Sequence, residues 1–112
     1  MESYEIKEHD VLVIGAGGAG LRAAIEASAQ GVSVGLVCKS LLGKAHTVMA
    51  EGGMAASLGN ADPRDHWEFH FRDTIRGGKH LNNWRMVEIF CREAAERVDE
   101  LEEWGALFDR NE

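Results

Sequence analysis

The 112-residue sequence has few cysteines, fewer basic than acidic side chains, and a single proline, Pro63. Its two cysteines, Cys38 and Cys91, lie far apart in otherwise apolar stretches, which disfavours a disulfide framework and an oxidising compartment. Twelve Lys and Arg residues stand against nineteen Asp and Glu residues, giving a net charge of −7. This charge disfavours nucleic acid as the main partner, because binding there depends on cations that neutralise phosphates.

Long apolar runs and a basic N-terminus are absent as well. No stretch approaches the ~18 consecutive apolar residues of a transmembrane helix, and the first ten residues are acidic where a secretory signal peptide is basic. With 45% hydrophobic residues, the sequence is nevertheless apolar enough to bury a core. These features predict a folded, reduced, cytoplasmic chain with no direct insertion into a membrane.

Glycine has the most informative distribution. Ten of the 13 glycines lie between Gly15 and Gly59, whereas all three tryptophans lie in the second half. We therefore divide the sequence at about residue 60. Residues 1–60 predict a strand, a glycine turn, a helix, a second strand and a long loop, and residues 61–112 predict helices.

The order of elements in the first part predicts an α/β fold. Residues 10–14, DVLVI, form an almost continuous apolar run, which is typical of a strand that helices cover on both faces of a parallel sheet. The alanine-rich residues 21–30 predict a helix, and residues 32–37 predict a second strand. Together they predict a βαβ unit with two parallel strands.

A G-x-G-x-x-G motif lies between the first strand and the helix. Its positions are Gly15, Ala16, Gly17, Gly18, Ala19 and Gly20. The first glycine permits a tight turn, the second lets the backbone approach a pyrophosphate, and the third lets helix and strand pack closely. The helix N-terminus then presents free amides to the phosphates. Because the motif follows a strand and opens a helix, we interpret it as a dinucleotide-binding turn rather than an ordinary glycine turn.

One part of the usual dinucleotide-binding pattern is missing. An acidic residue at the end of the second strand normally holds a ribose hydroxyl, and this sequence has Cys38, Lys39 and Ser40 there. An NAD-type cofactor is therefore disfavoured. On these residues alone NADP stays open, since Lys39 could favour a 2′-phosphate and Ser40 could contact ribose or phosphate.

The loop after the second strand, residues 39–60, is too long for a plain connection between a strand and a helix. Long loops at the carboxyl ends of parallel strands are where ligands bind. His46 lies in its middle, between Lys44 and Thr47. A single loop histidine is more often a surface hydrogen-bonding residue than a functional group, and both interpretations stay open at this point.

Four consecutive blocks resemble one protein family. They are HDVLVIGAGGAGLRAAIEASAQG, KSLLGKAHTVMAEGGMAASLGN, DHWEFHFRDTIRGG and ELEEWGALFDR. Taken together they resemble the flavoprotein subunit of succinate dehydrogenase and fumarate reductase, over about residues 10–110. The glycine motif is shared by many flavoproteins, whereas HTV-x-A-x-GG after the second strand is much narrower.

The resemblance implies FAD as the cofactor and a Rossmann-like FAD-binding fold. The glycine motif would meet the pyrophosphate, and Cys38, Lys39 and Ser40 would lie near the adenosine ribose. The residues expected near the flavin ring are Ala45, His46, Thr47, Ala50, Glu51, Gly52 and Gly53. In this family the loop histidine is covalently bonded to the flavin, so His46 is the expected attachment point. Such a link is expected to raise the reduction potential of the flavin, which suits the oxidation of succinate.

Two positions depart from the family pattern. Ala45 stands where serine is common, so one possible hydroxyl contact is lost. Glu51 stands where glutamine is common, and a carboxylate near the flavin would disfavour its anionic reduced form. Neither change removes a group needed for attachment.

Three alternatives differ in their cofactor. L-aspartate oxidase and soluble fumarate reductases are similar flavoproteins, but they bind FAD non-covalently and generally lack the loop histidine, so His46 disfavours both. A module of another class would bind NADP through Lys39. A non-enzymatic dinucleotide-binding module would require the gene to stop after Glu112.

The second part predicts two helices that cover the flavin domain. Asp62 and Pro63 predict the start of the first helix, as its N-cap and first residue. The apolar residues of this helix are spaced four apart, at Trp67, Phe71 and Ile75. His66 and His70 could share a metal, but no third ligand is evident, and we interpret both as part of a solvated face.

The second helix of this part follows Asn83 and ends at Gly105. Its apolar stripe comprises Val87, Phe90, Ala94, Val98 and Leu101. Cys91 is expected to pack as a small apolar residue. The stretch holds no nucleophile–base pair and no zinc-binding spacing, so no catalytic residue and no metal ligand is predicted.

Two parallel strands make too small a sheet for a complete domain. We therefore expect residues 1–60 to be the FAD-binding βαβ unit with its flavin loop, and residues 61–112 to continue the same, truncated domain. The resemblance implies that the full-length enzyme interconverts succinate and fumarate, and that this fragment alone is inactive. It also implies partners, namely an iron–sulfur subunit and a membrane-anchor subunit, together with a dicarboxylate substrate and a peripheral position on the inner face of the cell membrane.

Overall fold

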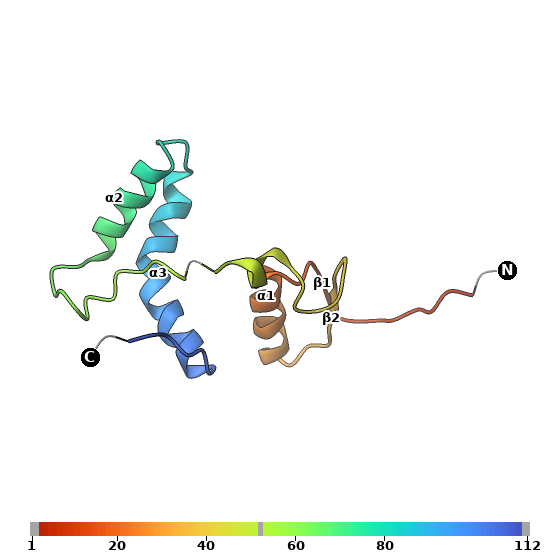
Figure 1. Ribbon diagram of the computed structural model, residues 1–112. Helices are drawn as coiled ribbons and strands as arrows, with labels where there is room; N and C mark the ends of the chain where they lie inside the picture. The colour runs from red at the N-terminus through yellow and green to blue at the C-terminus, as the bar shows by residue number, and fades with distance from the viewer. Residues whose placement is uncertain (1–2, 52, 111–112) are drawn as a thin grey trace. The chain divides into compact units, whose positions relative to one another are not determined.

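The computed structural model describes residues 3–51 and 53–110 (Figure 1). The chain divides into two compact units, Met1–Gly53 and Met54–Glu112. The elements in chain order are β1 (Val11–Ile14), α1 (Gly18–Ala29), β2 (Val34–Val37), the 3₁₀ helix η1 (His46–Met49), α2 (Trp67–Gly77) and α3 (Trp84–Glu103).

The first unit is the predicted βαβ unit. Strands β1 and β2 are parallel, with Val11 opposite Val34 and Ile14 opposite Val37. Helix α1 connects them and packs on both strands. The helix begins three residues before its predicted start, because the last three positions of the glycine motif already form its first turn. Strand β2 begins two residues later than predicted.

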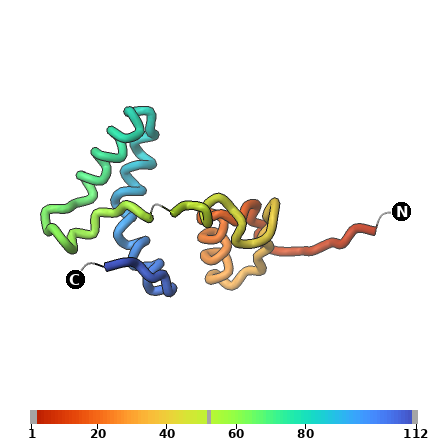
Figure 2. The backbone as a smooth tube through the Cα atoms, viewed as in Figure 1, coloured from red at the N-terminus to blue at the C-terminus, as the bar shows by residue number. Residues whose placement is uncertain are grey.

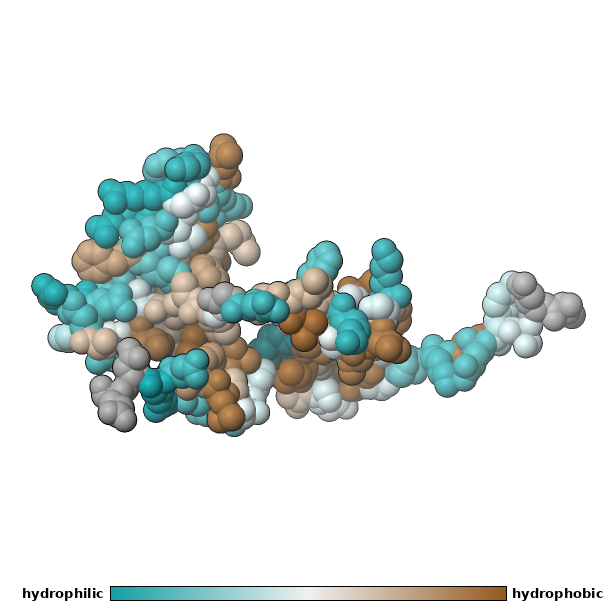
Figure 3. All heavy atoms as spheres, in the orientation of Figure 1, coloured by the Kyte–Doolittle hydropathy of each residue, from teal (hydrophilic) through white to brown (hydrophobic). Residues whose placement is uncertain are grey.

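The sheet is covered on one face only. Val11 and Val13 are half-buried, whereas Leu12 is 58% and Ile14 82% exposed. Hydrophobic residues are accordingly visible on the surface of this unit (Figure 3). Coverage on both faces of β1 is therefore not present within the described residues. This exposure is consistent with the predicted incomplete domain, because parallel sheets are normally buried on both faces.

The second unit is a hairpin of α2 and α3, which pack against each other (Figure 2). Its centre is Cys91, which is 1% exposed, followed by Ala94 at 7%. The thiol of Cys91 lies 3.8 Å from the Thr74 hydroxyl across the two helices. Both predicted helices and the buried position of Cys91 are thus confirmed.

The predicted start of α2 at Asp62 and Pro63 is wrong. Helix α2 begins at Trp67, and Asp62 instead closes an isolated turn, in which its backbone carbonyl accepts from the Asp65 amide at 2.9 Å. The Asp62 carboxylate accepts from the backbone amide of Arg64 at 2.9 Å and from its guanidinium at 2.8 Å. The guanidinium of Arg64 holds the pKa of the Asp62 carboxyl below its usual value.

The solvated face predicted for His66 and His70 is wrong for one of the two. His66 is exposed, whereas His70 is half-buried and its ring lies edge-on to Phe90, at 5.3 Å between centroids. His70 stands three residues after Trp67, so it faces α3 together with the apolar stripe. Its Nδ1 is buried without a hydrogen-bond partner among the described residues.

The two helices are joined by an ordered turn. Lys79 and His80 both adopt left-handed backbone conformations, with φ of 54° and 61°. The Asn82 side chain donates to the Thr74 carbonyl at 3.3 Å, and the Asn83 side chain accepts from the Met86 amide at 3.4 Å as the N-cap of α3. None of the helices in the described part of the chain is long and apolar enough to cross a bilayer.

Candidate functional site

The glycine motif forms a tight turn at the carboxyl end of β1. Gly15 has a φ of 108°, a conformation that favours glycine, and its amide donates to the Val37 carbonyl at 2.7 Å. A Cβ at Gly20 would lie 1.8 Å from the Gly15 carbonyl oxygen and 3.5 Å from the Val13 side chain. The third glycine of the motif therefore lets α1 pass directly against the turn, as the motif predicts.

The N-terminus of α1 presents backbone donors at this turn. Gly17 is the N-cap and has no side chain to accept from the first amides of the helix. The first four amides of a helix have no intrahelical acceptor, and the helix dipole places partial positive charge there. Ala16, directly before, is 6% exposed and packs beneath the turn. This set of donors suits an anionic group such as a pyrophosphate.

The long loop after β2 folds back onto the same turn (Figure 2). The Gly18 amide donates to the Thr47 hydroxyl oxygen at 3.0 Å. A Cβ at Gly17 would lie 3.3 Å from that oxygen and 3.9 Å from the Ala45 Cβ. Two segments that the sequence analysis assigned to one cofactor, the glycine motif and the loop around His46, are thus in direct contact.

His46 is the first residue of η1. Ala45 is the N-cap of η1, and its carbonyl accepts from the Val48 amide at 3.1 Å. The Thr47 carbonyl accepts from the Ala50 amide at 3.2 Å, which closes the short helix. The His46 side chain is exposed and makes no hydrogen bond or ion pair within residues 3–51 and 53–110. Its imidazole is therefore accessible to a ligand.

The remaining predicted residues lie near the carboxyl end of β2 or at the end of the loop. The Cys38 thiol donates to the Ser40 carbonyl at 2.6 Å, which forms a turn directly after β2. Lys39 and Glu51 are exposed, and neither side chain is paired within the described part of the chain. Gly53 has a φ of 81°, and the Gly52 prediction lies outside the described residues. No contact joins Lys39, Ser40 or Glu51 to the glycine turn among the described residues.

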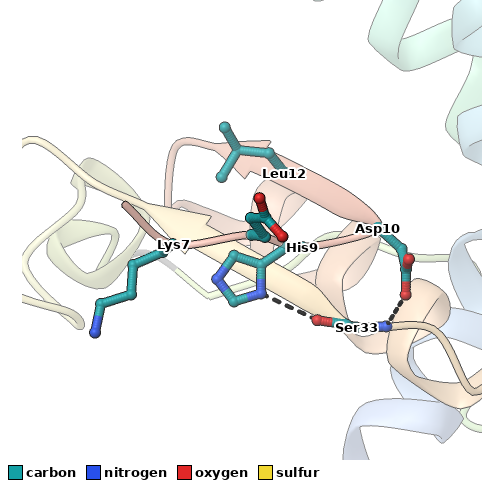
Figure 4. A pocket seen from close by; sticks show the side chains of 6 residues that line it. Lys7, His9, Asp10, Leu12 and Ser33 are labelled. Carbon is teal, nitrogen blue, oxygen red and sulfur yellow. Dashed lines mark hydrogen bonds between the residues drawn. The ribbon is translucent and has the colours of Figure 1, made fainter. Parts of the chain in front are cut away.

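A second hollow of the first unit lies at the opposite, amino end of the sheet. This cavity of about 530 Å³ is lined by Lys7, Glu8, His9, Asp10, Leu12 and Ser33. Figure 4 shows His9 and Asp10 both directed toward Ser33. His9 Nδ1 lies 3.1 Å from the Ser33 hydroxyl, but Asp10 accepts from the Ser33 backbone amide at 2.8 Å and not from the imidazole. A nucleophile–base–orienter chain is therefore not formed.

The second unit has a hollow of about 580 Å³ beside the C-terminal half of α3. Val98 and Phe108 are among its apolar lining residues, and Glu102 pairs with Arg110 at its edge. Within the described residues, no three His, Cys, Asp or Glu side chains gather as a metal site. The glycine turn with the η1 loop is thus the candidate site, since it lies at the carboxyl ends of the strands, where open α/β sheets bind their ligands.

Comparison with protein families gives one match, to the FAD binding domain, over residues 10–112. This family binds the flavin that the resemblance implies, so the NADP alternative left open by Lys39 is not supported.

Similar proteins of known name include a fumarate reductase of the CoM/CoB type from Methanothermobacter marburgensis, whose matching chain is 51% identical over 113 residues. The mitochondrial succinate dehydrogenase flavoprotein subunit of Oryza sativa is 43% identical over 112 residues. These matches cover 100% and 98% of this chain but only 20% and 18% of the relatives. The chain thus spans about a fifth of the length of the relatives it matches.

Solved structures agree with the sequence matches. A chain of the Mycobacterium smegmatis Sdh1 complex is 64% identical, with a TM-score of 0.85 over 92% of this chain and 17% of that one. The open form of a flavocytochrome c3 fumarate reductase is 32% identical, with a TM-score of 0.79 over 91% of this chain and 19% of that one.

Proposed function

Because the chain belongs to the FAD binding domain family, we propose that it forms the first cofactor-binding segment of a succinate dehydrogenase or fumarate reductase flavoprotein subunit. The observation that carries the proposal is the contact between Gly18 and Thr47, which joins the glycine motif to the loop that carries His46.

The backbone of the glycine turn binds the FAD pyrophosphate. The residues assigned to this role are Gly15, Ala16, Gly17, Gly18, Ala19 and Gly20. The amides at the N-terminus of α1 donate to phosphate oxygens, and the absence of side chains at Gly17 and Gly18 lets the phosphates approach the backbone. Cys38, Lys39 and Ser40 follow β2 at the same end of the sheet and lie near the adenosine ribose.

The loop residues line the flavin ring, and His46 forms the covalent bond. The ring-lining residues are Ala45, His46, Thr47, Ala50, Glu51, Gly52 and Gly53. The exposed, unpaired imidazole of His46 supports this role, because its ring nitrogen has no competing partner among the described residues. One C–N bond replaces an imidazole N–H and a flavin C–H bond, and the two hydrogens with their electron pair reduce the flavin.

The full-length protein interconverts succinate and fumarate. The bound flavin supplies two-electron chemistry by accepting or donating a hydride, and the other substrate-binding and proton-transferring groups lie beyond residue 112. An iron–sulfur subunit takes up the electrons singly, and a membrane-anchor subunit passes them on. The flavoprotein itself then lies at the inner face of the cell membrane through these partners. The names of the relatives and of the Sdh1 complex support this assignment.

L-aspartate oxidases and soluble fumarate reductases remain the alternatives with non-covalent FAD. A flavocytochrome c3 fumarate reductase is similar to this chain, but its identity of 32% is half the 64% shared with the Sdh1 complex. The loop histidine favours the covalent assignment.

The test uses the full-length protein, purified and denatured in acid. Wild-type protein should retain flavin fluorescence on the polypeptide, whereas His46→Ala should release all of its FAD to the supernatant. His66→Ala is a matched control, since this exposed histidine lies outside the site. Flavin released from the wild type, or retained by His46→Ala, contradicts the covalent assignment.

A further inference from the structure

We propose that Thr47 is a positioning residue, which caps helix α1 from the η1 loop and thereby holds His46 at the glycine turn. This inference rests on the proposed attachment of FAD to His46. It assigns to Thr47 a task distinct from flavin contact, because the partner of its hydroxyl is a backbone amide of the protein.

The first step is the missing cap of α1. An N-cap residue usually offers a side-chain oxygen to the first amides of its helix. Gly17 has no such oxygen and makes no side-chain cap hydrogen bond. Thr47, 29 residues later in the chain than Gly18, supplies the hydroxyl instead and accepts from the Gly18 amide at 3.0 Å.

The second step is the packing of the Thr47 methyl group. A Cβ at Gly18 would lie 3.3 Å from Thr47 Cγ2, and a Cβ at Gly17 would lie 3.3 Å from Thr47 Oγ1. Both distances are tighter than most Cβ contacts in proteins, so the bare backbone of the two glycines is what lets Thr47 lie on the turn. The contact therefore has a polar part, which serine can keep, and a shape, which valine can keep.

The third step connects Thr47 to its neighbour. His46 and Thr47 share the single turn of η1, which the bonds from Val48 to Ala45 and from Ala50 to Thr47 hold in place. The His46 side chain has no hydrogen bond of its own among the described residues. Its position at the glycine turn is thus set by the backbone that Thr47 anchors. The Thr47 hydroxyl also keeps its proton for a further donation, because a hydroxyl accepts and donates at once.

The experiment compares two variants of the full-length protein. Thr47→Val keeps the shape and removes the hydroxyl, and Thr47→Ser keeps the hydroxyl. Each protein is prepared without flavin and mixed with FAD, and both total bound FAD and acid-stable flavin are followed over time. We expect Thr47→Val to bind FAD but to form acid-stable flavin about fivefold more slowly, the factor that corresponds to the ~1 kcal/mol of an N-cap hydrogen bond. Thr47→Ser should attach flavin at a rate close to that of the wild type.

Two measurements separate positioning from a merely structural role. A structural role would lower total FAD and the melting temperature together and leave the attachment rate per bound FAD unchanged, and this result overturns the proposal. An attachment rate of Thr47→Val equal to that of the wild type overturns it as well, and so does a Thr47→Ser variant as slow as Thr47→Val. A wild type that forms no acid-stable flavin contradicts the proposed function itself and is recognised without any variant.

Discussion

Replacement of Gly20 by alanine should damage the protein although the residue lies in a helix. In an exposed helix interior, glycine to alanine is stabilising by up to about 1 kcal/mol, because glycine loses more backbone entropy on folding. At Gly20 the new Cβ would lie 1.8 Å from the Gly15 carbonyl oxygen and 2.9 Å from its carbonyl carbon. Local geometry therefore opposes the general preference.

The magnitude follows from what would have to move. To reach ordinary contact at 3.4 Å, the Gly15 carbonyl and α1 must separate by about 1.6 Å in a close-packed region. The obstacle is backbone, which the Gly15 amide ties to β2 through the Val37 carbonyl. Overpacking of this kind costs about 1–3 kcal/mol and occasionally more, which exceeds the gain in helix propensity. A shift of this size also displaces the amides proposed to bind pyrophosphate.

Gly77→Ala is the matched control. Gly77 is the last residue of α2, and a Cβ there would meet nothing within 4 Å. In the full-length protein, Gly20→Ala should lower both the melting temperature and the FAD content per polypeptide, whereas Gly77→Ala should leave FAD unchanged and the melting temperature unchanged or higher. Full FAD loading and unchanged stability of Gly20→Ala would refute the reasoning, as would equal damage from Gly77→Ala.

Two further substitutions test the packing around the site and the helical hairpin. Gly35→Ala should lower the free energy of unfolding, because its Cβ would lie 2.5 Å from the His9 ring, and His9→Ala should relieve that cost when the two changes are combined; additive losses in denaturant unfolding would contradict this contact. Asn83→Ala should lower the free energy of unfolding by about 1 kcal/mol through loss of the α3 cap, and Asn83→Asp should not, since aspartate also caps a helix N-terminus. Equal midpoints of thermal unfolding for the wild type and Asn83→Ala would show that this cap carries no stability.

Local patterns predicted the βαβ unit and the helical hairpin. The apolar run of β1 and the glycine motif define the strand, turn and helix within one short stretch, so the fold there does not depend on distant residues. The stripe of α3 likewise predicted the burial of Ala94. These elements could be read from the sequence because propensity and hydrophobic period agree.

The errors have physical causes that a one-dimensional pattern does not carry. Asp62 has the composition of an N-cap, but Arg64 competes for its carboxylate, and the helix begins only at Trp67. His70 was grouped with the polar residues because of its chemistry, whereas its spacing from Trp67 places it against Phe90.

Within the site, the sequence placed Thr47 beside the cofactor but indicated no partner for it. The hydrogen bond to Gly18 joins residues 29 apart and requires the loop to return to α1. No local signal encodes this return. The only sequence hint is that Gly17 cannot cap its own helix, so a hydroxyl from elsewhere is needed.

The central claim, that FAD is attached at His46, is tested most directly by peptide mapping of the full-length protein. Trypsin cleaves after Lys44 and Arg64, and the peptide between these sites, residues 45–64, contains His46 as its single histidine. Mass spectrometry should find the flavin on this peptide, with fragment ions that place it on the imidazole. An unmodified 45–64 peptide beside free FAD, or flavin on any other peptide, would contradict the account.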